Sequence, residues 1–309
     1  MTLAMMLAVT GCAGQPETVQ AVVGLSYIPN IQFGPVYVAD AQGWGGNESI
    51  SIRHHGADEG LFTALAAGEE QFVIAAGDEG LQAAEQGIEL VAVAPYYLEY
   101  PVRIIVPAES DITELADLQG KTIGLPGKYG ESWFGLLVAL DTAGLSQEDV
   151  EIQEIGYTAQ AALPTGKVDA VVGFINNDFV QFQAAGVNVR ALEVAPDSVP
   201  LVSATLFTTS EFYQKHKDVV ETVKSFLQKG ITESVENPEA AIEAAVDYIP
   251  SFNESAQQAA RVTLDATLAL MVDADGNVPT ALDEGQWQEM GEFLQDVGVL
   301  REKSRVTFS

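Results

Sequence analysis

The feature of this chain that most restricts its fold is a regular alternation of strand-like and helix-like segments. Short apolar runs rich in β-branched residues, such as residues 71–76 and 170–174, are each followed by a segment of helical character. This alternation is typical of α/β proteins, in which helices cover parallel sheets. We therefore predict an α/β fold with parallel sheets. After residue 201, one more strand is followed by helices only.

The strand and helix segments fall into two sets, which indicates two lobes. We predict that residues 21–101 and residues 201–309 build the first lobe, and that residues 102–200 are inserted between them as the second lobe. Two chain crossings between lobes make a hinge, and the cleft between hinged lobes is a common place for a small ligand. We therefore expect a ligand cleft between the two lobes.

The charge balance excludes several classes of partner. The chain has 14 Lys and Arg residues against 44 Asp and Glu residues, which gives a formal net charge of −30. A negative field of this size repels phosphate backbones, so we expect no nucleic-acid binding. The three histidines lack the spacing of a metal-binding motif, and we expect them on the surface. Neither a metal ion nor a cofactor is predicted.

Residues 1–20 are predicted to form a lipoprotein signal and a polar tether. An apolar run leads into the sequence Val-Thr-Gly-Cys, which ends at Cys12 and resembles a bacterial lipobox. Because of this motif, the thiol of Cys12, the only cysteine, is expected to carry lipid after cleavage; the alternative is an N-terminal apolar segment without a targeting role. The protein would then be exported and held at the membrane with its body in water. Because no basic residue precedes the apolar run, we expect translation to begin upstream of Met1.

The first candidate binding segment follows the first predicted strand. In open parallel sheets, the carboxyl ends of the strands face the ligand crevice. Amide side chains placed there can both donate and accept hydrogen bonds, and aromatic rings can stack on a flat ligand. The alternative is a strand-to-helix turn with an Asn cap and aromatic residues in the core. The candidates are Tyr27, Asn30, Gln32, Phe33 and Tyr37.

A glycine-rich loop at residues 124–133 is the second candidate, because it joins a predicted strand to a predicted helix. Backbone N–H groups at the start of that helix can hold an anionic or carbonyl oxygen. The loop lacks the spacing of a P-loop, so nucleotide hydrolysis is not predicted. Alternatively, the glycines serve only the backbone conformation of the loop. The candidates are Gly127, Lys128, Tyr129, Gly130 and Trp133.

Further candidates occupy the ends of other strands and the first lobe crossing. Asp78 is explained equally well as a helix cap and as a hydrogen-bond acceptor for a ligand. Tyr97 precedes the crossing, where it can line the cleft or pack against the hinge. The candidates in this set are Gly77, Asp78, Tyr97, Asn176 and Asn177.

Several of these segments resemble a known family. The motifs are Tyr-Ile-Pro-Asn at 27–30, Gly-Pro-Val-Tyr-Val-Ala at 34–39, Leu-Ala-Ala-Gly-Glu at 65–69, Asp-Leu-Gln-Gly-Lys-Thr-Ile-Gly-Leu-Pro at 117–126 and Gly-Lys-Val-Asp-Ala-Val-Val-Gly at 166–173. Through them, the chain resembles the substrate-binding lipoproteins of ABC importers in the thiamin-pyrimidine-synthase-like group, which also holds the aliphatic-sulfonate binders. The likeness runs from about residue 22 to about residue 269. It implies a two-lobed periplasmic-binding-protein fold of the second type, and delivery of the ligand to an ABC permease and its ATPase.

The resemblance also bears on the ligand and on catalysis. Pyrimidine-making enzymes of this group carry a His where this chain has Phe33, and a cysteine-rich motif that this chain lacks, so the resemblance implies no enzyme activity. The binding segments look most like those of members proposed to bind riboflavin, with formyl-aminopyrimidine binders close behind. We therefore expect a monomeric binding protein for a planar nitrogen heterocycle. The alternatives are an aliphatic-sulfonate or taurine-type binding protein, for which Lys128 is one of few cations in the loops, and a pyrimidine-synthase-like enzyme.

Overall fold

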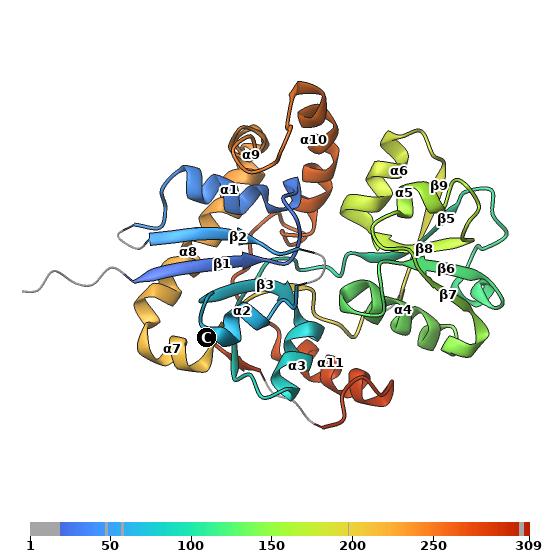
Figure 1. Cartoon of the computed structure of the whole chain (residues 1–309), viewed down its shortest axis with the longest axis horizontal. Coiled ribbons are helices and arrows are strands. Elements are labelled where there is room, and N and C mark those ends of the chain that lie inside the picture. Colours follow the sequence, from blue (N-terminus) through green and yellow to red (C-terminus); the bar gives the residue numbers. More distant parts are fainter. Residues whose placement is uncertain (1–18, 47–48, 57–58, 197, 303–305) are drawn as a thin grey trace, which may run out of the picture.

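The protein consists of two sheets, each flanked by helices, that lie next to each other along the long axis of the molecule (Figure 1). The computed structural model describes residues 19–46, 49–56, 59–196, 198–302 and 306–309. The predicted lipoprotein signal, with Cys12, lies outside these residues. In the described part of the chain, no helix is both long and apolar enough to span a bilayer.

The first lobe is built on a six-stranded sheet with the order β11-β4-β10-β3-β1-β2 in the described chain. Its strands are β1 (Gln20–Leu25), β2 (Ser49–His54), β3 (Phe72–Ala76), β4 (Leu90–Pro95), β10 (Ala204–Thr209) and β11 (Thr307–Phe308). Its helices are η1 (Ile31–Phe33), α1 (Gly34–Ala41), α2 (Thr63–Ala67), α3 (Gly77–Glu85), α7 (Ser210–Lys215), α8 (Lys217–Glu236), α9 (Pro238–Ala245), α10 (Glu254–Ala269) and α11 (Glu284–Asp296). Every residue of β3 is buried, as expected for a strand covered by helices on both faces.

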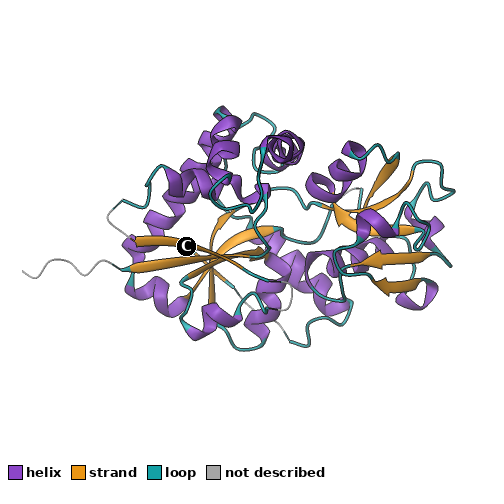
Figure 2. Cartoon of the chain, turned by 45° about the horizontal axis from the view of Figure 1, so that its top comes forward, coloured by secondary structure: helices purple, strands orange, loops and turns teal. Residues whose placement is uncertain are grey.

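The second lobe is built on a five-stranded sheet with the order β7-β6-β8-β5-β9 in the described chain. Its strands are β5 (Val102–Pro107), β6 (Thr122–Leu125), β7 (Glu151–Glu154), β8 (Ala170–Phe174) and β9 (Val189–Glu193). Its helices are η2 (Leu115–Leu118), α4 (Gly130–Thr142), η3 (Gln147–Asp149), α5 (Ala159–Ala162), η4 (Ile175–Phe179) and α6 (Val180–Ala184). The helices lie on both sides of this sheet as well (Figure 2).

Both sheets are mixed, so the prediction of parallel sheets is wrong. β10 pairs antiparallel with β3 and β4, and β5 pairs antiparallel with β8 and β9. β5 is the first strand after the chain passes from the first lobe to the second, and β10 is the first strand after it returns. Each begins at the sheet edge where its neighbours end, with Ala204 opposite Ala76 and Val102 opposite Phe174. Parallel pairing would require a crossover connection back to the far edge, which these direct crossings do not make.

The helical segment predicted after residues 170–174 begins with a different kind of turn. A single π-helical turn, η4 (Ile175–Phe179), follows β8 directly, and α6 begins only at Val180. The short strand β11, which pairs with β4, was not predicted because two residues are too few for a pattern.

The prediction of surface histidines is wrong for His55. Its side chain is fully buried, with Nε2 2.8 Å from Oε1 of Glu70, whose side chain is also fully buried. Arg53 donates a hydrogen bond to the same carboxylate group. Polar groups are buried in proteins when such partners satisfy them. The sequence pattern around the histidine does not reveal this partner, which lies on another segment.

Candidate functional site

A cavity of about 940 Å³ lies between the lobes, where the strands of both sheets end. On the first lobe, residues that follow β1 and β4 form its wall, together with the start of α3. On the second lobe, the wall comes from residues after β6, β7 and β8 and from the start of α4. This is the crevice that the strand-end rule predicts for open α/β sheets.

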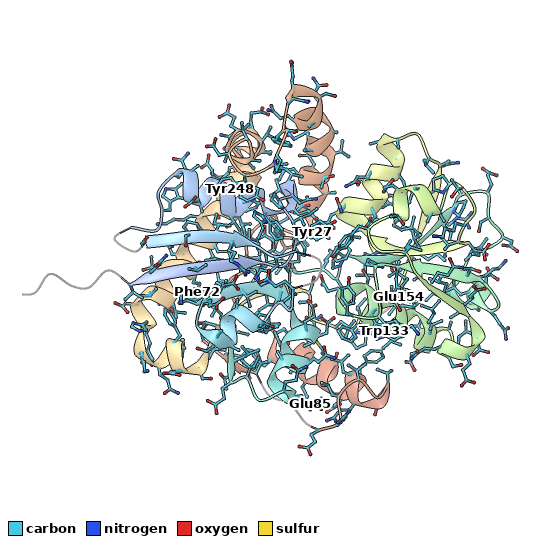
Figure 3. The ribbon with its side chains drawn as sticks, in the orientation of Figure 1. Tyr27, Phe72, Glu85, Trp133, Glu154 and Tyr248 are labelled. Atoms are coloured by element: carbon cyan, nitrogen blue, oxygen red, sulfur yellow. The ribbon has the colours of Figure 1, made fainter. Side chains whose placement is uncertain are left out.

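The structure brings about half of the predicted site residues to this cavity. Those that line it are Tyr27, Asn30, Gln32, Phe33, Tyr97, Tyr129, Gly130 and Asn177. Those that do not line it are Tyr37, Gly77, Asp78, Gly127, Lys128, Trp133 and Asn176. Figure 3 shows Tyr27 between the two lobes, whereas Trp133 lies on the α4 side of the second lobe.

Tyr37 lies beneath the first binding segment and supports it. The side chain is fully buried, and its ring stacks on that of Tyr248 with 4.3 Å between the ring centroids. The Tyr37 hydroxyl donates a hydrogen bond to the backbone carbonyl of Asn30 at 3.1 Å. The ring thus fixes the backbone of Asn30 from below and is not available for stacking on a ligand.

Asn30 uses only part of its hydrogen-bonding capacity within the protein. Its Oδ1 accepts a hydrogen bond from the backbone N–H of Gln32 at 3.0 Å and caps η1. The amide nitrogen of Asn30 has no hydrogen-bond partner among the described residues, and the residue lines the cavity. The side chain therefore offers a ligand its N–H donors and the second lone pair of Oδ1.

Three further predicted residues are buried around the cavity without lining it. Asp78 accepts a hydrogen bond from the backbone N–H of Glu79 at 2.7 Å, as a residue in the first turn of α3. Asn176 donates to Oγ1 of Thr267 at 3.0 Å, which joins η4 to α10 across the lobes. Gly77 donates its backbone N–H to the carbonyl of Val202 at 2.9 Å. These residues connect the elements that surround the cavity.

Lys128 and Trp133 lie at a second, smaller cavity of about 270 Å³ beside the C-terminal end of α11. The Nζ atom of Lys128 is 5.5 Å from the centroid of the Trp133 ring, within the range of a cation–π contact. Gln82 and Tyr129 contribute to both cavities. The glycine-rich loop therefore directs its cation away from the cleft between the lobes.

Aromatic rings from both lobes meet at the cleft. Tyr157, which follows β7, lies edge-on to Tyr27 with 5.2 Å between the ring centroids and 80° between the ring planes. Phe174 at the end of β8 also lines the cavity. We did not predict Tyr157 or Phe174 as site residues, although both stand at the carboxyl end of a strand. The rule that located Tyr27 could have found them.

Carboxyl groups from the two lobes also face each other here. Glu79 at the start of α3 and Glu131 at the start of α4 both line the cavity. Burial raises the pKa of Glu79 to about 7. Burial, with the neighbouring Glu79 carboxylate as a smaller cause, raises the pKa of Glu131 to about 8. Ser203 donates a hydrogen bond to Oε1 of Glu131 at 2.9 Å.

The charges that line the cavity all have one sign. Its wall contains the carboxyl groups of Glu59, Glu79, Glu131 and Asp178, and no Lys, Arg or His among the described residues. Burial raises the pKa of Asp178, whose carboxylate accepts a hydrogen bond from the backbone of Phe174 at 2.8 Å. An anionic ligand would have no opposite charge to pair with in this wall. The arrangement favours a ligand that is neutral or that carries hydrogen-bond donors.

Comparison with known proteins supplies a family for this architecture. The model of the NMT1/THI5 like family matches residues 30–241. The chain belongs to the NMT1/THI5-like family. The resemblance deduced from the sequence motifs is thereby confirmed.

Relatives within and around the NMT1/THI5-like family have known names or structures. The chain is 30% identical over 292 residues to the riboflavin-binding protein RibY of Chloroflexus aurantiacus, which covers 93% of this chain and 83% of RibY. It is 24% identical over 294 residues to the formylaminopyrimidine-binding protein of Halalkalibacterium halodurans, with 92% and 88% covered. Among solved structures, the alkanesulfonate-binding protein SsuA of Xanthomonas axonopodis pv. citri, bound to MOPS, matches with a TM-score of 0.72 at 19% identity. That match covers 96% of this chain and 100% of SsuA. The two-lobed periplasmic-binding-protein fold is thus confirmed.

Proposed function

We propose that this protein is the extracytoplasmic substrate-binding component of an ABC importer. It captures a neutral, planar nitrogen heterocycle between its lobes and delivers it to the permease. The observation that carries the proposal is the wall of the cavity, which combines aromatic rings and side-chain amides with carboxyl groups and, among the described residues, no cation. The names of the riboflavin- and formylaminopyrimidine-binding relatives support this class of ligand.

Each chemical feature of such a heterocycle has a counterpart in the wall. Tyr27 and Tyr157 offer ring faces and edges from opposite lobes, which suits a flat aromatic ligand. The amide groups of Asn30 and Asn177 can hydrogen-bond to ring nitrogens and carbonyl oxygens. The raised pKa values of Glu79 and Glu131 let one carboxyl group donate and another accept near neutral pH. Riboflavin and formylaminopyrimidine are the two candidate ligands.

The charge of the cavity disfavours the alternative of a sulfonate-binding protein. A sulfonate is permanently anionic, and four carboxyl groups line the wall. Lys128, the cation of the glycine-rich loop, lies at the smaller cavity beside Trp133. The likeness to SsuA therefore extends to the fold, while the wall chemistry of this chain suits another ligand.

Binding without catalysis is proposed for the same cavity. The pyrimidine-making enzymes that this chain resembles carry a His where this chain has Phe33. Their iron-dependent chemistry depends on that His and on a cysteine-rich motif. Phe33 is buried against Tyr96, with 6.4 Å between the ring centroids. We expect no turnover when the protein is incubated with iron. Formation of a pyrimidine product under those conditions would contradict this part of the proposal.

The decisive experiment identifies what the protein binds. Native mass spectrometry of freshly purified protein should reveal a co-purified heterocycle. Calorimetric titration of ligand-free protein should then show saturable binding of riboflavin or of formylaminopyrimidine, and none of an alkanesulfonate. Binding of the sulfonate, with no binding of either heterocycle, would overturn the proposal.

We also propose that the protein is a monomer held at the membrane by lipid on Cys12. The motif before Cys12 supports the anchor, and the residue lies outside the described part of the chain. Replacing Cys12 by Ala should move the protein from the membrane fraction to the soluble extracytoplasmic fraction without changing ligand binding. If the Cys12→Ala variant stays in the membrane fraction, another anchor must exist.

A further inference from the structure

One wall of the large cavity belongs to the first lobe alone and carries polar groups that the protein does not use. This α2–α3 wall consists of the segment leading into α2, of α2 itself and of α3 with the residues after it. Its polar side chains include Thr63, Gln82 and Gln86. Their hydroxyl and amide groups have no hydrogen-bond partner among the described residues. Unused donors and acceptors that line a cavity are available to a ligand.

The same wall has an apolar base. Phe62 and Ala83 are buried, and Ile88 is partly buried, and all three line the cavity beside the free polar groups. A surface of this kind suits a chain with a carbon backbone and outward-pointing hydroxyl groups. The carbon atoms pack against the apolar side chains, while the hydroxyls bond to the amides, which both donate and accept.

The cavity has room for more than a single ring. Its volume of about 940 Å³ lies near the upper end of the range of roughly 300–1,000 Å³ for sites that enclose most of a ligand. A pyrimidine packed against the Tyr27–Tyr157 pair, whose rings touch edge-on, would leave much of this volume unfilled. A ligand that fills the cavity therefore extends from the aromatic pair between the lobes toward α2 and α3.

The charge of the wall restricts what this extension can be. Glu59 lies on the α2–α3 wall, and its pKa is lowered by a hydrogen bond from Arg53, so its carboxylate is ionised at neutral pH. Glu79 lines the cavity from the start of α3. The Glu59 carboxylate is paired with Arg53, so the group that a phosphorylated chain would meet unpaired is the carboxyl group of Glu79. The cavity wall offers such a chain no cation among the described residues, whereas a neutral polyol needs none.

Resting on the proposed function, we propose that the α2–α3 wall binds a neutral, hydroxyl-rich chain attached to the heterocycle, with Gln82 among its hydrogen-bonding groups. The ligand class is then a flat ring system that carries a polyol, as in riboflavin, rather than a free pyrimidine.

The test compares three flavins that differ only in the chain. Riboflavin carries the polyol, lumiflavin has a methyl group in its place, and riboflavin 5′-phosphate carries a charged end. Titrations followed by flavin fluorescence should show the tightest binding for riboflavin in the wild-type protein. In Gln82→Ala, the affinity for riboflavin should fall roughly 2- to 13-fold, as for the loss of one hydrogen bond. The affinity for lumiflavin should stay the same.

A matched control is Gln183→Ala, which removes an exposed Gln on α6 that does not line the cavity. This variant should bind all three flavins like the wild type. Equal wild-type affinities for riboflavin and lumiflavin would overturn the inference, as would an equal loss for both in Gln82→Ala. Binding of formylaminopyrimidine with no binding of flavins would overturn it and leave the proposed function standing. Binding of neither heterocycle would overturn both.

Discussion

Asn30 has two roles that a substitution can separate. Its Oδ1 caps η1 through the backbone N–H of Gln32, and its amide nitrogen is free at the cavity. An Asp at this position retains the capping oxygen, since Asp and Asn cap helices about equally well. It loses the N–H donor that the ligand would use.

We expect Asn30→Asp to melt close to the wild-type temperature and to bind its heterocycle more weakly. Asn30→Ala should lose both roles, with a decrease of about 0.5–2 kcal/mol in the free energy of unfolding from the lost cap. Asn237→Ala is the control, because Asn237 precedes α9 without a side-chain capping bond. Thermal unfolding and calorimetric titration of the three variants provide the comparison. If Asn30→Asp binds the heterocycle with wild-type affinity, the amide nitrogen of Asn30 does not take part in binding.

Tyr157 is a second residue whose role can be tested alone. Its half-exposed ring contacts Tyr27 edge-on across the lobes. Tyr157→Ala should weaken binding of a flat ligand roughly 2- to 13-fold, from the loss of one aromatic contact, whereas Tyr157→Phe should retain most of the affinity. Tyr213→Ala, on α7 and away from the cavity, serves as the control. A large loss in Tyr157→Phe would instead assign the role to the hydroxyl group.

At the scale of elements, the starts of α3 and α4 face each other from opposite lobes. Oε1 of Glu79 lies 3.1 Å from the position that a Cβ atom on Gly130 would occupy, so the carboxyl group of one lobe touches the first turn of the other lobe's helix. Besides Glu131, the titratable groups around it are Asp78 and Tyr100. Burial raises the pKa of both, and nearby carboxyl groups raise it further. None of the charges that shift the pKa values of Asp78, Glu79, Tyr100 and Glu131 is a cation.

We expect this arrangement to make ligand capture depend on pH. With the lobes arranged as they are here, burial raises the pKa values of Glu79 and Glu131 to about 7 and about 8, above the ordinary value for Glu. The closed state therefore binds protons more tightly than an open, solvated state. The contribution of this tighter proton binding to ligand affinity is complete at acidic pH, below the ordinary pKa of a carboxyl group. It is lost as the pH rises through about 7 to about 8.

The measurement is ligand affinity across this pH range in the wild type and in Glu131→Gln. The Gln amide keeps an oxygen for Ser203 and cannot ionise, so the variant should show a flatter pH profile with higher affinity at alkaline pH. Glu211→Gln, which changes an exposed carboxylate paired with Lys215, should follow the wild type. A wild-type affinity that does not change from neutral to alkaline pH would contradict the argument.

At the scale of the whole molecule, the charge of −30 acts on stability. Like charges repel across the surface of the compact state, and salt screens this repulsion over a Debye length that falls from about 30 Å at 0.01 M to about 3 Å at 1 M. We expect the melting temperature to rise when NaCl is increased between these concentrations. KBr should give the same rise if screening is the cause, because screening depends on ionic strength alone. An unchanged melting temperature would contradict the repulsion argument.

The positions of most strands and helices could be predicted from the sequence, because they follow from local patterns. The apolar run at residues 71–76 became β3, and the helix expected after the glycine-rich loop became α4. The strand-end rule also located Tyr27, Asn30 and Tyr129 at the cavity, since the carboxyl ends of parallel strands share one edge of a sheet. Alternation along the chain is a local property, and the neighbours of each residue in the sequence determine it.

Only the tertiary structure decided which way the side chains and the crossing strands point. Tyr37 and Lys128 stand in the predicted binding segments, but the packing of α1 on Tyr248 and the position of Trp133 direct them away from the cavity. The antiparallel direction of β5 and β10 follows from where the chain enters each lobe. The opposition of Glu79 and Glu131 arises because two helices from different lobes begin at the same cleft. Such contacts join segments far apart in the chain, and each depends on packing that a local pattern does not contain.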